Sequence, residues 1–129
     1  MGEHRVRSRR QAERWKKELN RYRHFQRFIR ENAPDILASR NFHKNKQFIQ
    51  HGNITVSDHV LSVARCSLAL TDMFHISCNK RELIRGALLH DYFLYDWHSS
   101  GEGHTFHAFT HASDAFANAQ KEFELSRVE

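Results

Sequence analysis

Apolar residues recur at steps of three and four along much of this chain, which is the spacing of amphipathic helices. The first such segment is predicted to be helical from Arg9 to Asn32. Pro34 then ends this helix or begins the next one, because proline lacks the N–H group that a helix interior requires. One side of this first helix forms a stripe of Trp15, Leu19, Tyr22, Phe25 or Gln26, and Ile29.

The middle of the chain predicts shorter elements. One or two short helices are expected between Ile36 and about Gln50. The sequence His51-Gly52-Asn53 then interrupts the pattern, because glycine readily adopts the left-handed conformation that ends a helix. The apolar anchors of this region are Ile36, Leu37, Phe42, Phe48 and Ile49.

A longer helix is predicted next, and it runs to about Phe74. Ser57 or Thr55 can cap its N-terminus, since a hydroxyl oxygen can accept a hydrogen bond from a free backbone N–H. Because His59 falls in register with apolar residues, we expect it to point inward. The face that it shares is formed by His59, Val63, Cys66, Leu70 and Met73.

Two further helices complete the predicted fold. Asn79 caps a mostly apolar helix from Lys80 to about Tyr95, and Thr110 caps the last helix after a polar loop at 97–106. The expected fold is therefore all-α, with five or six helices packed orthogonally or as a bundle. The buried side of the last helix is predicted to be Ala112, Ala115, Phe116, Ala119 and Phe123.

Composition supports one helical domain. The chain has 129 residues, of which 40% are hydrophobic, and it contains a single proline and five glycines, too few for a turn-rich β fold. Neither a signal peptide nor a membrane-spanning run is evident in the sequence. Cys66 and Cys78 show no metal or redox spacing and are expected to be reduced thiols. We therefore expect a cytoplasmic protein.

Charge is distributed unevenly. Residues 1–30 contain eleven Lys and Arg and three Glu, a net charge of +8, whereas 31–129 have a net charge of −3. The basic first helix could bind RNA or an acidic surface. Alternatively, it could pack its apolar stripe on the core and expose a solvated basic face. Docking is favoured because the aromatics keep helical register, so we do not expect a nucleic-acid partner. Aromatic residues of 15–29 left exposed would invite formation of a homodimer.

Histidines are the main candidates for chemistry, and eight of the eleven lie between 51 and 111. His59, His90 and Asp91 each fall on the apolar side of a predicted helix, where an imidazole or a carboxylate is costly unless it is paired or bound to a metal. A single histidine in the position of His59 is more often a core residue with its hydrogen bonds formed than a metal ligand. Together the three favour a divalent transition metal such as Mn, Fe, Co, Ni or Zn. His107 and His111 share a face only if that turn is helical.

Several separated motifs resemble, in the right order, those of the HD-domain superfamily of metal-dependent phosphohydrolases. The motif sequences are most similar to those of a small bacterial group within this superfamily. The resemblance spans roughly residues 22 to 125. The motifs are Gln50-His51-Gly52, His59, the run Gly86-Ala87-Leu88-Leu89-His90-Asp91, the run Phe93 to His98, and the segment His107 to His111.

The resemblance implies a metal held by His59, His90, Asp91 and an aspartate from a later helix. If two ions bind, His107 and His111 would hold the second and Asp91 would bridge; if one binds, those histidines could contact phosphate. The implied function is a phosphohydrolase acting on a small phosphorylated metabolite or nucleotide, with a metal-bound water attacking phosphorus. Asp96 could orient that water or act as general base, or could simply pair with a neighbour.

Two departures from the family pattern bear on this expectation. The last metal-ligating aspartate of the family is expected in a helix beyond Glu129. Tyr92-Phe93 replaces the Gly-Lys that often follows the His-Asp pair, which is His90-Asp91 in this chain. We therefore expect a basic helical extension over 1–21 and an HD-like helical bundle over 22–129. The bundle is expected to lack the last helices of the family core. The extension and the bundle are expected to form one globular unit. The alternative function is a degenerate HD module that binds a nucleotide or a protein partner without turnover.

Overall fold

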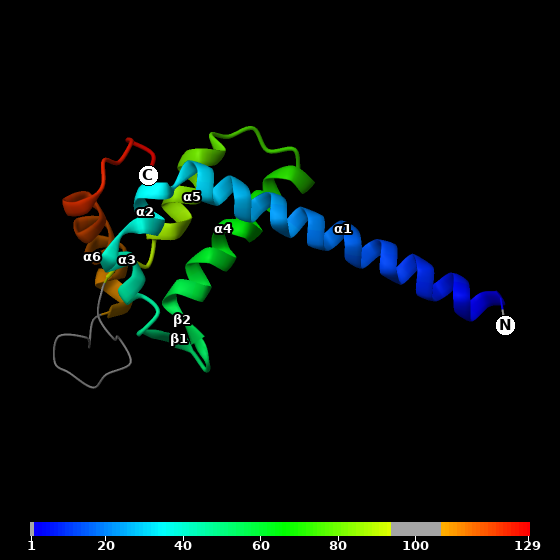
Figure 1. Cartoon of the computed structure of the whole chain (residues 1–129). Coiled ribbons are helices and arrows are strands. Elements are labelled where there is room, and N and C mark those ends of the chain that lie inside the picture. The colour runs from blue at the N-terminus through cyan, green and yellow to red at the C-terminus, as the bar shows by residue number, and fades with distance from the viewer. Residues whose placement is uncertain (1, 94–106) are drawn as a thin grey trace.

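The computed structural model describes residues 2–93 and 107–129, with side chains for 8–93 and 112–129. The chain is mostly helical, as predicted, with one small antiparallel sheet in its described part (Figure 1). Its elements are α1 (Gly2–Asn32), α2 (Pro34–Ala38), α3 (Arg40–Lys44), β1 (Ile49–His51), β2 (Ile54–Thr55), α4 (Val56–Met73), α5 (Lys80–Leu89) and α6 (His107–Glu122).

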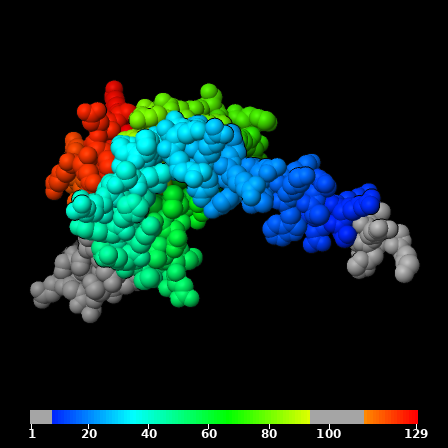
Figure 2. All heavy atoms as spheres, viewed as in Figure 1, coloured from blue at the N-terminus to red at the C-terminus, as the bar shows by residue number. Residues whose placement is uncertain are grey.

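Helix α1 begins earlier than predicted and packs on the core only through its C-terminal part. Phe25 and Ile29 are buried, which confirms docking for this part of the stripe. Trp15, Leu19 and Tyr22 remain 69%, 48% and 48% exposed, so the predicted docking is wrong for Trp15 and Leu19. Figures 1 and 2 show the reason, because the N-terminal part of α1 extends away from the body of the molecule. Tyr22 is half covered, with the guanidinium of Arg65 on α4 5.1 Å from its ring centroid.

The segment predicted as short helices ends in a β-hairpin instead. Ile49 pairs with Thr55, and His51 pairs with Ile54, in antiparallel register. Gly52 has a φ of +55°, a left-handed conformation that suits glycine, and it lies in the turn between the strands. Residues 51–53 therefore belong to the β-hairpin, where they reverse the direction of the chain, and they do not end a helix.

Helix α4 begins at the predicted cap. The Thr55 hydroxyl accepts a hydrogen bond from the Asp58 N–H, and the Asp58 carboxylate accepts one from the Thr55 N–H, which makes a capping box. The predicted buried face is wrong for Cys66, Leu70 and Met73, which are exposed. The face that packs on the core is instead Val56, Ser57, Val60, Ala64, Leu68 and Thr71.

Helix α5 begins at Asn79, whose side chain accepts hydrogen bonds from the next helical N–H groups, as predicted. It ends at Leu89 and not at Tyr95, and His90 to Phe93 form a turn. The predicted positions 94 and 95 lie outside the described residues.

Helix α6 begins at His107, earlier than the predicted cap at Thr110. Its small residues Ala115 and Ala119 are buried together with Phe123, as predicted, whereas Ala112 and Phe116 are exposed. Small side chains allow a close approach between this helix and the turn after α5.

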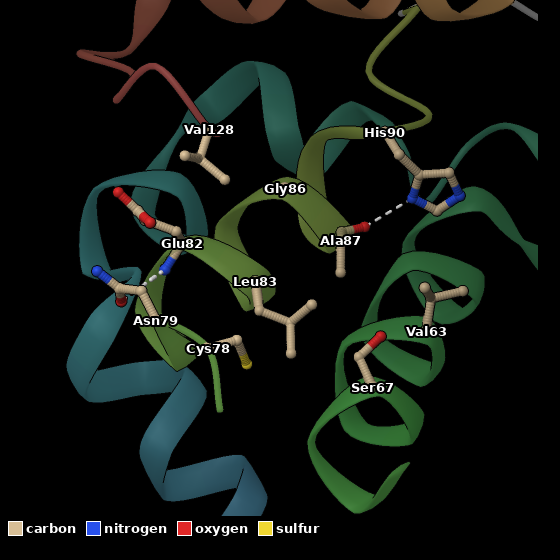
Figure 3. Close-up of a pocket in the computed structure, with 10 residues that line it drawn as sticks. All are labelled: Val63, Ser67, Cys78, Asn79, Glu82, Leu83, Gly86, Ala87, His90 and Val128. Atoms are coloured by element: carbon tan, nitrogen blue, oxygen red, sulfur yellow. Dashed lines mark hydrogen bonds between the residues drawn. The ribbon is translucent and has the colours of Figure 1, made fainter. Parts of the chain in front are cut away.

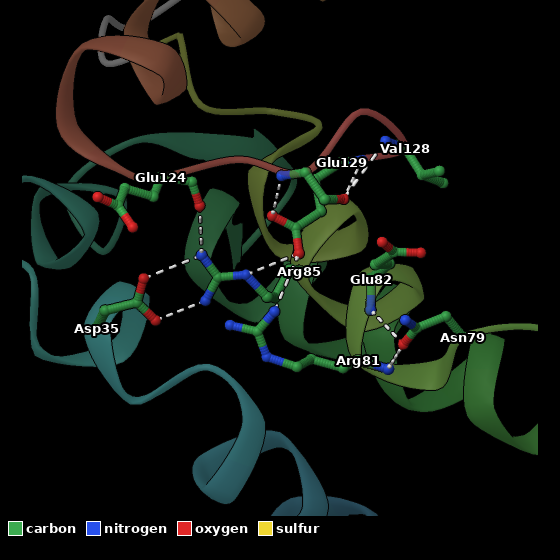
Figure 4. A network of polar contacts seen from close by, with 9 residues as sticks. Asp35, Asn79, Arg81, Glu82, Arg85, Glu124, Val128 and Glu129 are labelled. Atoms are coloured by element: carbon green, nitrogen blue, oxygen red, sulfur yellow. Dashed lines mark hydrogen bonds and ion pairs between the residues drawn. The ribbon is translucent and has the colours of Figure 1, made fainter.

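A buried arginine joins three distant parts of the chain (Figure 4). Arg85 of α5 is 1% exposed, and its guanidinium donates two hydrogen bonds to Asp35 of α2, over 2.6 and 2.9 Å. Its Nε lies 2.9 Å from Glu129 Oε1, and Nη2 donates to the carbonyl oxygen of Glu124. These contacts compensate the cost of burying the charge and hold the C-terminal segment against α2 and α5.

Within the described part of the chain, no helix combines the length and the apolar character needed to cross a membrane.

Candidate metal centre

The contact between α4 and α5 brings His59 close to His90 and Asp91. His59 lies one turn after the cap of α4, and the dyad lies directly after the last residue of α5. His59 Nε2 is 3.4 Å from Asp91 Oδ2, and His90 Nε2 is 3.3 Å from the same oxygen. The three residues predicted to share a metal are therefore neighbours in space.

The cluster combines a buried carboxylate with two accessible imidazoles. Asp91 is 1% exposed, whereas His59 is half-buried and His90 is exposed. Their candidate ligand atoms all lie within 4.8 Å of one another. A buried carboxylate is stable only when positive charge or hydrogen-bond donors face it, and the imidazoles occupy that direction.

Hydrogen bonding determines which nitrogen of His90 faces the cluster. His90 Nδ1 lies 2.7 Å from the carbonyl oxygen of Ala87 (Figure 3). A carbonyl oxygen only accepts, so Nδ1 carries a proton. Nε2 then either carries a second proton, which it donates to Asp91, or presents its lone pair to a metal ion placed between the two side chains. Such a contact to the second ring nitrogen is typical of metal-binding histidines.

Asp91 also changes the proton affinity of this ring. The hydrogen bond with the Asp91 carboxylate raises the pKa of His90, and the contact with Ala87 acts in the same direction although burial opposes both. A proton and a metal ion therefore compete for the same nitrogen, Nε2.

Two of the separations between candidate ligand atoms are compatible with a shared metal ion. Bonds from zinc to imidazole nitrogen or carboxylate oxygen measure about 2.0–2.2 Å, so two ligand atoms in tetrahedral coordination lie about 3.4 Å apart. The separations of 3.4 and 3.3 Å around Asp91 Oδ2 match this value. Two imidazoles and one carboxylate suit Mn, Fe, Co, Ni or Zn better than the oxygen-preferring Ca²⁺.

Residues around Asp91 hold the turn, and sequence reasoning did not identify them. Tyr92 and Phe93 are buried, and Asn118 Nδ2 of α6 donates to both of their carbonyl oxygens over 3.0 Å. The Tyr92 hydroxyl donates to Glu122 Oε2 over 2.6 Å. Burial and the carboxylate of Glu122 both raise the pKa of Tyr92, so the hydroxyl stays a donor. The departure at Tyr92-Phe93 was the signal available in the sequence.

A third imidazole adjoins the cluster. The ring of His51, on β1, lies 5.7 Å from the ring of His59 between centroids, in an edge-to-face arrangement. The rings of His59 and His90 are 5.4 Å apart, so the hairpin extends the row of imidazoles. In the sequence, only the resemblance at Gln50-His51-Gly52 pointed to His51. No local pattern indicated its contact with His59, which is eight residues later and on α4.

The remaining predicted site residues are not tested by these contacts. Asp96 lies outside the described residues. His107 and His111 both fall within α6, so the backbone is helical over that turn, as their pairing required. Their side chains lie outside the described part, and their role stays a prediction.

A groove of about 420 Å³ lies beside the cluster, with His90 at one end (Figure 3). Its walls come from α4 and α5 and are mainly apolar, with Val63, Leu83 and Ala87 among them. Asn79 and Glu82 add polar groups at the start of α5. This volume is within the range of small-molecule sites.

Comparison of the chain with protein-family models, with curated proteins and with solved structures found no match in any of the three. The arguments for function therefore come from the motifs and from the geometry of the metal-binding cluster.

Proposed function

We propose that this chain is a metal-dependent phosphohydrolase of the HD type that acts on a small phosphorylated metabolite or nucleotide. The observation that supports the proposal best is the convergence of His59, His90 and Asp91, whose ligand atoms lie within 4.8 Å of one another. These three residues occupy the positions at which the HD motifs place metal ligands.

Each residue has a distinct task in this proposal. A bound divalent ion supplies Lewis acidity toward a phosphoryl oxygen and lowers the pKa of water. His59 and His90 offer their Nε2 atoms to the ion, and the Ala87 carbonyl keeps His90 in the tautomer that allows this. Asp91 supplies a negative charge from a buried position, which strengthens its attraction for a cation because few waters screen it.

The groove beside His90 supports a small substrate. A phosphate at the cluster would leave the rest of the molecule next to the mainly apolar walls formed by α4 and α5. An apolar wall suits a carbon skeleton or a nucleobase, and it contributes little to the binding of further phosphates. We therefore favour substrates with one phosphoryl group near an apolar portion.

The test begins with the metal content of protein purified without chelator and reconstituted anaerobically with Mn, Fe, Co, Ni or Zn. We expect one or two ions per chain, and loss of the ion in the His90→Ala variant. His43→Ala is the matched control, because His43 is an exposed histidine on α3 outside the cluster. Loss of metal in both variants, or retention in both, would contradict the proposed site.

The loaded protein is then assayed with p-nitrophenyl phosphate and a panel of nucleotides. Turnover that disappears in both His90→Ala and Asp91→Ala would support the hydrolase. Stoichiometric metal with ligand binding and no turnover of any phosphoester would support the degenerate binding module instead.

A further inference from the structure

The N-terminal part of α1 is a cationic helix that projects from the molecule. Every side chain from Ser8 to His24 is exposed, and Figure 2 shows the N-terminal part of the helix standing away from the body. Further along, the guanidinium of Arg65 on α4 lies over the Tyr22 ring, 5.1 Å from its centroid. Residues 1–30 have a net charge of +8, whereas 31–129 have a net charge of −3. The exposed residues 8–24 contain seven Lys and Arg and two Glu, a net charge of +5, so much of the positive charge lies where the core does not cover α1.

The cations form two rows along α1, beside an apolar stripe. At 100° per residue, one row contains Arg10, Arg14, Lys17 and Arg21, and the other contains Arg9, Lys16, Arg23 and Arg27. Trp15, Leu19 and Tyr22 are exposed and occupy a third side of the helix, about 90° from the second row and about 140° from the first. Basic side chains interleaved with exposed aromatic rings are typical of nucleic-acid-binding surfaces.

Repulsion between like charges within each row lowers the stability of α1. Arg10 and Arg14 are four residues apart, as are Lys17 and Arg21, and such pairs repel on a helical surface. Only two ion pairs within α1 offset this repulsion among its described side chains, Arg21 with Glu18 and Arg27 with Glu31. A polyanion along the helix would remove the repulsion.

Two other partners fit this surface less well. A second α1 would bring two helices of net charge +7 together around a seam of only three exposed apolar residues. An interfacial membrane helix needs a continuous apolar face, and positions 8, 11 and 26 on this side are Ser, Gln and Gln. Single-stranded nucleic acid supplies phosphates for the rows and flat bases for the stripe.

We propose that α1, between about Arg9 and Arg23, binds single-stranded nucleic acid, with its cationic rows on the phosphates and Trp15 stacked on a base. The expectation of no such partner rested on burial of the stripe. That reason does not apply to Trp15 and Leu19, which the core leaves exposed. This activity is independent of the metal centre.

The test measures binding of the full chain to a fluorescein-labelled 20-nucleotide oligo(U) RNA by fluorescence polarisation, from 50 to 200 mM KCl. The triple variant Arg10→Gln, Arg14→Gln, Lys17→Gln is expected to bind at least about tenfold more weakly, with a salt slope reduced by about 2. Trp15→Ala is expected to bind about fivefold more weakly with an unchanged slope, because stacking releases no counterions.

Two control triples make the result specific. Lys44→Gln, Lys46→Gln, Lys121→Gln removes three exposed cations from the body and should change the affinity less than about twofold. Arg10→Lys, Arg14→Lys, Lys17→Arg keeps the charge and should bind within about twofold of wild type. Circular dichroism shows whether each variant keeps its helix content.

Several results would overturn the proposal. Equal losses in the α1 and body triples would mean general charge attraction, and no binding at 50 mM KCl would exclude the interaction. Tighter binding to phosphatidylglycerol vesicles than to RNA would assign the surface to membranes. A dimer in sedimentation that Trp15→Ala dissociates, without RNA binding, would assign it to a second copy.

Discussion

The hydroxyl of Tyr92 donates a hydrogen bond to Glu122 Oε2 over 2.6 Å, and this contact joins the residue next to Asp91 to the last turn of α6. Glu122 also accepts hydrogen bonds from Ser39 and from Asn41 Nδ2, which lie at the start of α3. The turn that contains Asp91, the buried carboxylate of the candidate metal centre, is thus held by α6 and α3 together.

Replacing Tyr92 with Phe should reduce both stability and metal affinity. The change keeps the buried ring but removes the donor to Glu122, so we expect a loss of about 1–3 kcal/mol in the free energy of unfolding. Metal affinity should fall because Asp91 is held less firmly. Urea denaturation and metal titration measure the two effects. Tyr22→Phe is the matched control, because the hydroxyl is lost from an exposed ring, together with a solvent-exposed hydrogen bond from Gln26 Nε2, and this should cost less than about 0.5 kcal/mol.

Metal should stabilise the folded protein through the His59, His90 and Asp91 cluster. A ligand that binds only the folded state at 100 times its Kd adds about 2.7 kcal/mol, which thermal denaturation detects as a higher Tm. Asp91→Asn should abolish this shift. Asp72→Asn should keep it, since Asp72 is exposed and pairs with Lys80 away from the cluster. An equal shift in both variants would place the ion elsewhere.

Thr55→Ala should destabilise the start of α4, where His59 lies one turn further on. Loss of the hydroxyl removes the hydrogen bond to the Asp58 N–H, at a cost of about 1 kcal/mol. Thr55→Ser keeps the hydroxyl and should cost much less. Denaturation of the three proteins measures the difference, and similar stability of the Ala and Ser variants would show that the cap contributes little.

The pair of Asp35 and Arg85 should make stability depend on pH in acid. The Arg85 hydrogen bonds lower the pKa of Asp35 below its ordinary value of 3.8. Because the folded-state pKa is the lower one, the unfolded state binds the proton first, so this contribution is present above pH 3.8 and is lost as pH falls toward the folded-state pKa.

Asp35→Asn removes the titrating group, so its unfolding free energy should fall less steeply than that of wild type below pH 3.8. At neutral pH the variant should be less stable by about 1–3 kcal/mol, because the guanidinium loses the partner charge and one of its two acceptor oxygens at position 35. Arg85 keeps Glu129, which limits the loss. Parallel pH profiles for the two proteins would contradict this account.

The sequence by itself determined the features that depend on local chemistry. Thr55 and Asn79 cap their helices as predicted, because a cap is formed by residues within one turn of each other. The candidate ligands His59, His90 and Asp91 were also named from the sequence, as polar residues in apolar register. That argument is right for Asp91, which is buried, whereas His90 is exposed and most of the face predicted to be buried with His59 is exposed. Their proximity was inferred from the HD-like motifs, and the distances agree with it.

Only the tertiary structure decided which faces are buried and which distant residues meet. Trp15 and Phe25 share one helical stripe, yet only Phe25 contacts the core, because periodicity does not reveal where the neighbouring elements end. The contact of Tyr92 with Glu122 joins residues thirty positions apart, and no local pattern indicates it. Local hydrogen bonding starts the helices of this protein, whereas long-range packing selects their buried faces and holds the candidate site.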